Sequence, residues 1–171
     1  VNIGAGAMRL HNAGGYSGSN LRGVQEYVTL RLGWDFEDSP FGVELSGLLA
    51  PNMQRSVSGN DHRNSLYGFA FEGVYHLFDR YAEFDPFVAV GVGVYGSDST
   101  WMNGDDDAFV VQAGLGFNWH FAENFALRGD ARYHVATDDE YIAFTTADVG
   151  LTWYMGDRSN GAGNVAPLAE D

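Results

Sequence analysis

Residues 109–121 read FVVQAGLGFNWHF, and this stretch decides the fold. Its odd-numbered positions, from Phe109 to Phe121, are all apolar, whereas the even-numbered positions from Gln112 to His120 are polar or glycine. A period of two places the apolar side chains on one face of an extended strand. A strand of this length, when tilted, crosses a lipid bilayer.

The same alternation recurs along most of the chain. Within residues 26–36, for example, Leu30 and Trp34 share one parity while Thr29 and Arg31 share the other. Between such runs, long polar segments alternate with short turns, the pattern of an up-and-down antiparallel barrel with one elaborate end and one plain end. We predict an all-β fold, an eight-stranded antiparallel up-and-down transmembrane β-barrel. Its expected strands are 1–10, 26–36, 41–49, 65–77, 86–95, 108–121, 124–135 and 141–155.

The segments that lack the alternation are expected to be connections. The long ones are 11–25, 51–64 and 96–107, and the last outer loop is 136–140. The periodicity is lost again near the C-terminus, where small, polar and proline residues are typical of a linker. The sequence therefore predicts a barrel over residues 1–156 and a flexible tail or linker over residues 157–171.

Composition excludes several classes of function. Nine Lys+Arg residues against 23 Asp+Glu give a net charge of −14, which disfavours nucleic-acid binding because that binding depends on basic side chains neutralising phosphates. A polybasic grip on a membrane surface is disfavoured for the same reason. The chain has no Cys, so disulfides, thiolate nucleophiles and Cys-ligated zinc are excluded.

The balance between the two strand faces indicates a membrane barrel rather than a soluble one. Charged residues make up 19% of the chain and aromatic residues 15%, so the apolar face is too large to be left in water. An eight-stranded barrel has an interior just wide enough to be filled by side chains. We therefore expect the apolar face to contact lipid and the polar face to line the lumen.

Charged side chains on the polar face are the main candidate site. Charges enclosed in a narrow interior must be paired, because an unpaired buried charge costs several kcal/mol, and arginine can bind a carboxylate through two parallel hydrogen bonds. We interpret these residues as an ion-pair network that plugs the lumen; a gated pore and a proton relay are the alternatives. The predicted network comprises Arg31, Asp35, Glu44, Glu72, Arg128, Asp130, Arg132, His134 and Asp148.

Aromatic residues gather near the ends of the apolar faces. Girdles of aromatic side chains at the two membrane interfaces are typical of outer-membrane barrels, although strands are also enriched in aromatics for other reasons. The residues predicted to form these girdles are Trp34, Phe36, Trp119, Phe121 and Trp153 at the plain end, and Tyr67 and Tyr133 nearer the loops.

Other motifs carry little chemistry. The glycines of residues 91–96 match G-x-G-x-x-G, but no helix follows them, so a dinucleotide site is rejected. Acidic clusters at 105–107 and 138–140 are expected to be solvated loop tips, with bridging by Ca²⁺ or Mg²⁺ to anionic lipopolysaccharide as an alternative. Neither a zinc-protease histidine motif nor a nucleophile elbow is present in the sequence. We predict no catalytic residue, no metal ion and no cofactor.

Four stretches of the sequence resemble the transmembrane barrel of the outer membrane protein A family. They are FDPFVAVGVGVY at 84–95, QAGLGFNW at 112–119, NFALRGDARY at 124–133 and DVGLTWYM at 148–155. The resemblance extends over about residues 1–156 and is clearest from residue 84 onward. It implies a barrel in the cell outer membrane with periplasmic termini, extracellular loops and an interior ion-pair network. Many members of that family continue into a peptidoglycan-binding domain, so peptidoglycan is a partner only if such a domain follows Asp171.

These observations together predict a non-enzymatic structural protein of the outer membrane. It would support envelope integrity and present acidic and polar loops outside the cell, with outer-membrane lipid or lipopolysaccharide as its surroundings and a possible extracellular partner at the loops. A small-solute pore or a loop-mediated adhesin is the main alternative. A barrel enzyme that modifies lipid A is a third possibility.

Overall fold

The chain forms a closed barrel of eight antiparallel strands, each paired with its neighbours in sequence order. The structure is a computed structural model, and it describes residues 1–13, 24–57, 60–79, 82–97, 108–136 and 142–155. Among these residues no helix is long and apolar enough to cross a bilayer. The strands are β1 (Asn2–Ala13), β2 (Gln25–Asp35), β3 (Phe41–Val57), β4 (Asn60–His76), β5 (Phe84–Ser97), β6 (Ala108–Ala122), β7 (Phe125–Ala136) and β8 (Ile142–Trp153).

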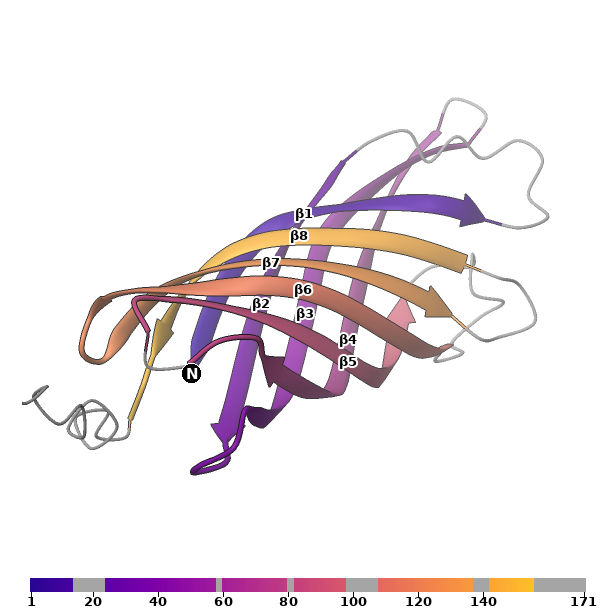
Figure 1. Ribbon diagram of the computed structural model, residues 1–171. Helices are drawn as coiled ribbons and strands as arrows, with labels where there is room; N and C mark the ends of the chain where they lie inside the picture. Colours follow the sequence, from indigo (N-terminus) through magenta and orange to yellow (C-terminus); the bar gives the residue numbers. More distant parts are fainter. Residues whose placement is uncertain (14–23, 58–59, 80–81, 98–107, 137–141, 156–171) are drawn as a thin grey trace, which may run out of the picture.

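Pairing between the first and last strands closes the barrel. Asn2 on β1 is opposite Thr152 on β8, and the ladder continues to the pair Ala13 and Ile142. The start of β1 and the end of β8 therefore lie at the same end of the barrel (Figure 1), the end that carries the short turns. Closure gives every strand a partner on both sides, which is what allows a sheet to span hydrocarbon. The predicted eight-stranded up-and-down barrel is confirmed.

The two faces of the sheet separate as the alternation predicts. Large apolar side chains point outward along all eight strands, among them Leu115 at 66% exposed and Val90 at 63%. Inward positions between them are buried and mostly polar, charged or small, as with Gln112 and Asn118 on β6. A surface this apolar would be unstable in water, so the exposed face is a lipid-facing face.

The connection predicted over residues 51–64 is wrong in its length. β3 continues to Val57 and β4 begins at Asn60, so these two strands run as a hairpin past the ends of their neighbours. The register shifts between Ala50 and Met53, where Pro51 is tolerated because a bulge does not need its missing N–H. The alternation is lost here because antiparallel pairing requires only backbone groups once the strands no longer contact lipid.

Glycine makes room for aromatic rings inside the barrel. Gly68 on β4 is paired with Tyr95 on β5, and a Cβ atom at position 68 would lie 2.3 Å from the Tyr95 ring. Gly116 on β6 is paired with Phe87 on β5 in the same way, with a Cβ at 2.5 Å from that ring. The rings of Tyr95 and Phe87 therefore each lie close over a glycine, which lets these two large side chains fit into a narrow lumen.

Candidate functional site

Seven charged side chains meet inside the half of the barrel nearer the short turns. Glu44 on β3 accepts hydrogen bonds from both terminal nitrogens of Arg128 on β7, at 2.6 and 3.1 Å. Arg132 on β7 donates to the same carboxylate at 3.3 Å and to Glu72 on β4 at 2.6 Å. Asp130 lies between the two arginines and accepts from both of them. Each of these side chains is almost fully buried.

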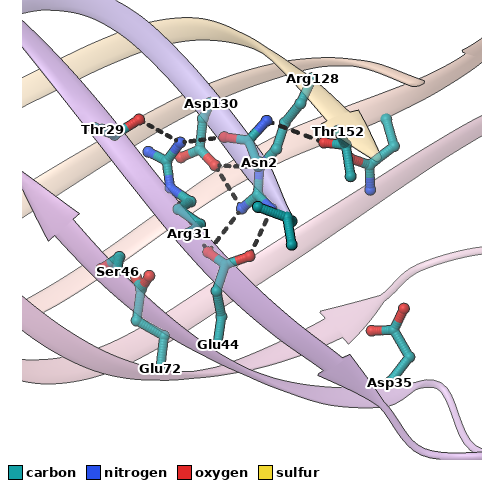
Figure 2. Close-up of polar contacts among 12 residues, drawn as sticks. Asn2, Thr29, Arg31, Asp35, Glu44, Ser46, Glu72, Arg128, Asp130 and Thr152 are labelled. Carbon is teal, nitrogen blue, oxygen red and sulfur yellow. Dashed lines mark hydrogen bonds and ion pairs between the residues drawn. The ribbon is translucent and has the colours of Figure 1, made fainter. Parts of the chain in front are cut away.

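Arg31 on β2 extends the cluster to the seam of the barrel. It binds Asp148 on β8 through two hydrogen bonds of 2.9 and 2.6 Å, and its Nε lies 3.6 Å from Glu44. Asn2 and Thr29 accept further hydrogen bonds from the same guanidinium (Figure 2). We call this set the ionic layer; it consists of Arg31, Glu44, Glu72, Arg128, Asp130, Arg132 and Asp148.

Two of the nine predicted network residues lie elsewhere. Asp35 is at the short-turn end, set apart from the arginines in Figure 2, and its carboxylate lies 3.4 Å from the ring of His76. His134 is buried above the ionic layer, where its Nε2 is 2.9 Å from the hydroxyl of Thr146 and its ring stacks on Phe144 at 4.3 Å. Asp35 thus lies beside a histidine and His134 beside a threonine, because inward parity alone does not fix the height of a side chain in the lumen.

A small polar cluster lies at the short-turn mouth of the lumen. Asp85 on β5 is buried and contacts Nδ1 of His76 at 2.8 Å, and Asn118 donates to the same carboxylate at 3.1 Å. Phe87 lies two residues further along β5 and presents its ring to the guanidinium of Arg128 at 4.5 Å. Asp85 falls between the predicted strands 65–77 and 86–95, although it shares parity with the inward residues Phe87 and Ala89.

An apolar cluster occupies most of the other half of the lumen, nearer the loops, beside the buried polar pair His134 and Thr146. Every one of the eight strands contributes to this cluster, which we call the apolar layer. Tyr27 and Tyr95 lie at the edge of this layer that faces the middle of the lumen. The Tyr27 hydroxyl donates to Asp148 at 2.8 Å, and the Tyr95 hydroxyl donates to Gln112 at 3.1 Å. The apolar layer consists of Met8, Tyr27, Leu48, Ala50, Leu66, Tyr95, Ala108, Val110, Ala136 and Phe144.

Sequence reasoning missed the apolar layer. Leu48 and Leu49 are adjacent, as are Val110 and Val111, so both faces of these strands are apolar near the loops. In the structure the even-numbered member of each pair is buried and the odd-numbered member is exposed. One sequence signal could have revealed this layer: near the loop ends of these strands, the inward-facing positions are apolar instead of polar.

The predicted interface aromatics all point outward. Trp34 is 72% exposed, and the exposed fraction of the other six is between 42% and 58%. Five lie near the short turns, and Tyr67 and Tyr133 lie on the loop-side half of β4 and β7. The acidic clusters at 105–107 and 138–140 and the predicted tail at 157–171 lie outside the described residues.

All the charged side chains of the ionic layer have partners within it, and buried pairs of this kind hold one another in place. Within the described ranges, no group of three or more His, Asp or Glu side chains is arranged to hold a metal ion.

Comparisons with known proteins place this barrel in a family. The family described as outer membrane protein beta-barrel domain matches residues 1–154. No curated protein matches the sequence. The resemblance to outer membrane protein A barrels is confirmed at the level of this family.

Solved structures share the fold at low sequence identity. Neisserial surface protein A is 13% identical with a TM-score of 0.63, covering 90% of this chain and 95% of its own. The outer membrane enzyme PagL is 12% identical with a TM-score of 0.60, covering 90% and 100%. The attachment invasion locus protein Ail of Yersinia pestis, solved with the heparin analogue sucrose octasulfate, is 19% identical with a TM-score of 0.53, covering 89% and 94%.

Likeness at such identities shows the fold alone, and these barrels differ in what they do. The match over residues 1–154 carries the classification, and the lipid-facing apolar surface agrees with it. The chain therefore belongs to the outer membrane protein beta-barrel domain family and is a protein of the cell outer membrane.

Proposed function

We propose that this protein is a structural, non-conducting and non-enzymatic barrel that braces the outer membrane and presents its loops outside the cell. The observation that carries the proposal is that the lumen is filled in two successive ways. The ionic layer occupies the half near the short turns, and the apolar layer occupies the half near the loops. A solute would have to displace both.

The ionic layer resists displacement because its members restrain one another. Removing one partner of a buried ion pair costs about 3–5 kcal/mol, since the other charge is then left without compensation. Glu44 alone interacts with three arginines, so its movement would leave several cations exposed to a low-dielectric interior. Thermal fluctuations should therefore rarely separate the ion pairs of this layer.

The alternatives differ from this proposal in what they require. A small-solute pore needs the ionic pairs to exchange partners and the apolar layer to move aside. An adhesin uses the loops and leaves the lumen closed. A lipid A-modifying enzyme needs a reactive site near the lipid-facing rim, and PagL shows that an enzyme is compatible with this fold.

Planar-bilayer conductance tests the proposal. The wild-type barrel is expected to give no steady single-channel current. A variant with four substitutions, two in each layer, is expected to conduct: Glu72→Ala and Arg132→Ala with Met8→Ala and Phe144→Ala. The matched controls are the two double variants that open one layer only, and both are expected to stay closed.

Gel migration of unboiled against boiled samples verifies that each variant is a folded barrel before current is measured. Steady conductance of the wild type would overturn the closed-lumen proposal and favour the pore. Incubation of the wild type with lipid A, followed by mass spectrometry, is expected to leave the lipid mass unchanged; a shift would identify an enzyme.

A further inference from the structure

The outer face of the barrel carries a polar row near the loops. Tyr133 on β7 is directly opposite Thr145 on β8, and Thr145 is opposite Arg9 on β1. Tyr133 and Arg9 are exposed and Thr145 is partly exposed, so the three side chains stand side by side on the lipid-facing surface. Outward positions at similar height on the other side of the barrel are apolar or aromatic, such as Leu49 and Phe69.

His11 joins this row through an irregularity in the strand. The register of β1 against β8 shifts between Leu10 and Asn12, so His11 is the extra residue of a bulge. Its Nε2 lies 2.6 Å from the hydroxyl of Thr145, and its ring is 6.2 Å from the ring of Tyr133. The bulge thus brings an imidazole to the polar row, beside the arginine.

Arg9 differs from the arginines of the lumen. Arg31, Arg128 and Arg132 are buried and each is paired with carboxylates, whereas Arg9 is exposed and has no ion-pair partner among the described residues. Glu26 on β2 is the nearest acidic position by register, opposite Ala7, and it makes no ion pair with Arg9 in the part of the chain that the structure describes. A cation on this surface that has no ion-pair partner in the part of the chain that the structure describes attracts an anion from its surroundings.

The row beneath consists of small side chains. Ala131 on β7, Ala147 on β8 and Ala7 on β1 are paired directly across the three strands. Leu115 on β6, opposite Ala131, is a larger neighbour at 66% exposed. Three adjacent methyl groups let a hydrocarbon chain approach the backbone closely just below the polar row.

We propose that Arg9, His11, Thr145 and Tyr133 bind the phosphate group of a membrane lipid in the leaflet that faces the loops. A guanidinium binds phosphate through paired hydrogen bonds, and an imidazole and two hydroxyls add further donors. The position of the row, where the outward face changes from apolar to polar, is the height of lipid headgroups. The acyl chain of the same lipid would lie over the three alanines.

The chain as a whole is too acidic to attract anions, with a net charge of −14, so this binding is local rather than a general attraction. That distinction can be measured. The folded barrel in a neutral detergent is titrated with diphosphorylated lipid A, and the retained lipid is counted by native mass spectrometry. The same lipid without its phosphates and inorganic phosphate alone are the two comparison ligands.

The variant Arg9→Gln is expected to weaken binding of the phosphorylated lipid about fivefold, which corresponds to about 1 kcal/mol for one cation at a membrane surface. His11→Gln is expected to weaken it less. The control is Glu123→Gln in the turn at the opposite end, which changes the net charge by one in the opposite direction and is expected to bind as the wild type does.

Three results would overturn the proposal. Equal retention of the dephosphorylated lipid would show that phosphate is not recognised. Equal binding by the wild type and the combined Arg9→Gln, His11→Gln variant would show that this row is not the site. Displacement of the lipid by inorganic phosphate at the same concentration would identify a general anion site. Each variant is first verified as folded by its gel migration.

Discussion

The two halves of the lumen are filled by opposite chemistry. Near the short turns, three arginines and four carboxylates form the ionic layer, and almost every polar atom has a partner. Near the loops, the apolar layer draws side chains from all eight strands and is joined to the ionic layer by the hydroxyl of Tyr27, which donates to Asp148. The first half depends on specific pairing and the second on volume, so they should fail in different ways.

The difference matters for how each half tolerates change. Breaking a buried ion pair by removing one partner costs much stability. Replacing all the charged residues together by well-packed apolar ones costs little, because the desolvation of the charges offsets their attraction. Apolar packing loses free energy in proportion to the atoms removed and the cavity left behind. The ionic layer should therefore be sensitive to which atom is removed, and the apolar layer to how much is removed.

The largest effect is expected from Arg128→Met. The substitution keeps most of the side-chain volume but leaves Glu44 and Asp130 without their main donor, so we expect a loss of about 4 kcal/mol in the free energy of unfolding. The measurement is urea unfolding in phosphatidylcholine vesicles, followed by tryptophan fluorescence. A loss as small as that of the exposed control Glu123→Gln, expected within about 0.5 kcal/mol, would show that the ionic layer contributes no specific pairing.

A smaller effect is expected from Phe144→Ala in the apolar layer. The ring is 4% exposed and contacts both His134 and Tyr95, so its removal should cost about 3 kcal/mol through lost burial and the resulting cavity. Phe144→Leu is the graded control and should cost less than half as much under the same urea titration. Equal losses for Ala and Leu would contradict a layer held by volume.

The smallest effect is expected from Glu72→Gln within the ionic layer itself. Four carboxylates face three arginines there, and Oε2 of Glu72 has no hydrogen-bond partner among the described residues. Gln keeps an oxygen for the 2.6 Å contact with Arg132 while removing the excess charge, so the change in unfolding free energy should be below about 1 kcal/mol. Glu44→Gln, which alters a carboxylate shared by three arginines, should cost clearly more; the reverse order would refute this view of the layer.

Much of the barrel could be predicted because strands that cross a membrane have a simple sequence pattern, the alternation of apolar and polar residues. In residues 109–121 one parity contacts lipid and must be apolar, so a single sequence shows both the strand and its outward face. The same parity placed Arg31, Glu44 and Arg128 inside. Where β3 and β4 extend beyond the lipid, outward positions need not be apolar. The hairpin beyond Ala50 therefore lacks the alternation and could not be predicted.

Partners inside the lumen could not be predicted in the same way. Whether His134 meets an arginine or Thr146 depends on the stagger of β7 against β8, which alternation does not encode. Asp35 was assigned to the inward parity, and at the short-turn end of β2 it contacts His76, a partner that parity does not reveal. Parity gives the direction of a side chain, while height comes from the register of the whole closed sheet.

The seam between β1 and β8 has a consequence for how the barrel is assembled. Arg31 and Asp148 are 117 positions apart in the chain, and they meet across β1 only when the last strand has joined the first. Until then Arg31 lacks its closest carboxylate, and only Glu44 on the neighbouring strand β3, 3.6 Å from its Nε, offsets its charge in the membrane interior. Pairing of β8 with β1 thus completes the charge balance of the early strands. A chain that ends before β8 is therefore disfavoured in the bilayer, so insertion itself selects complete chains.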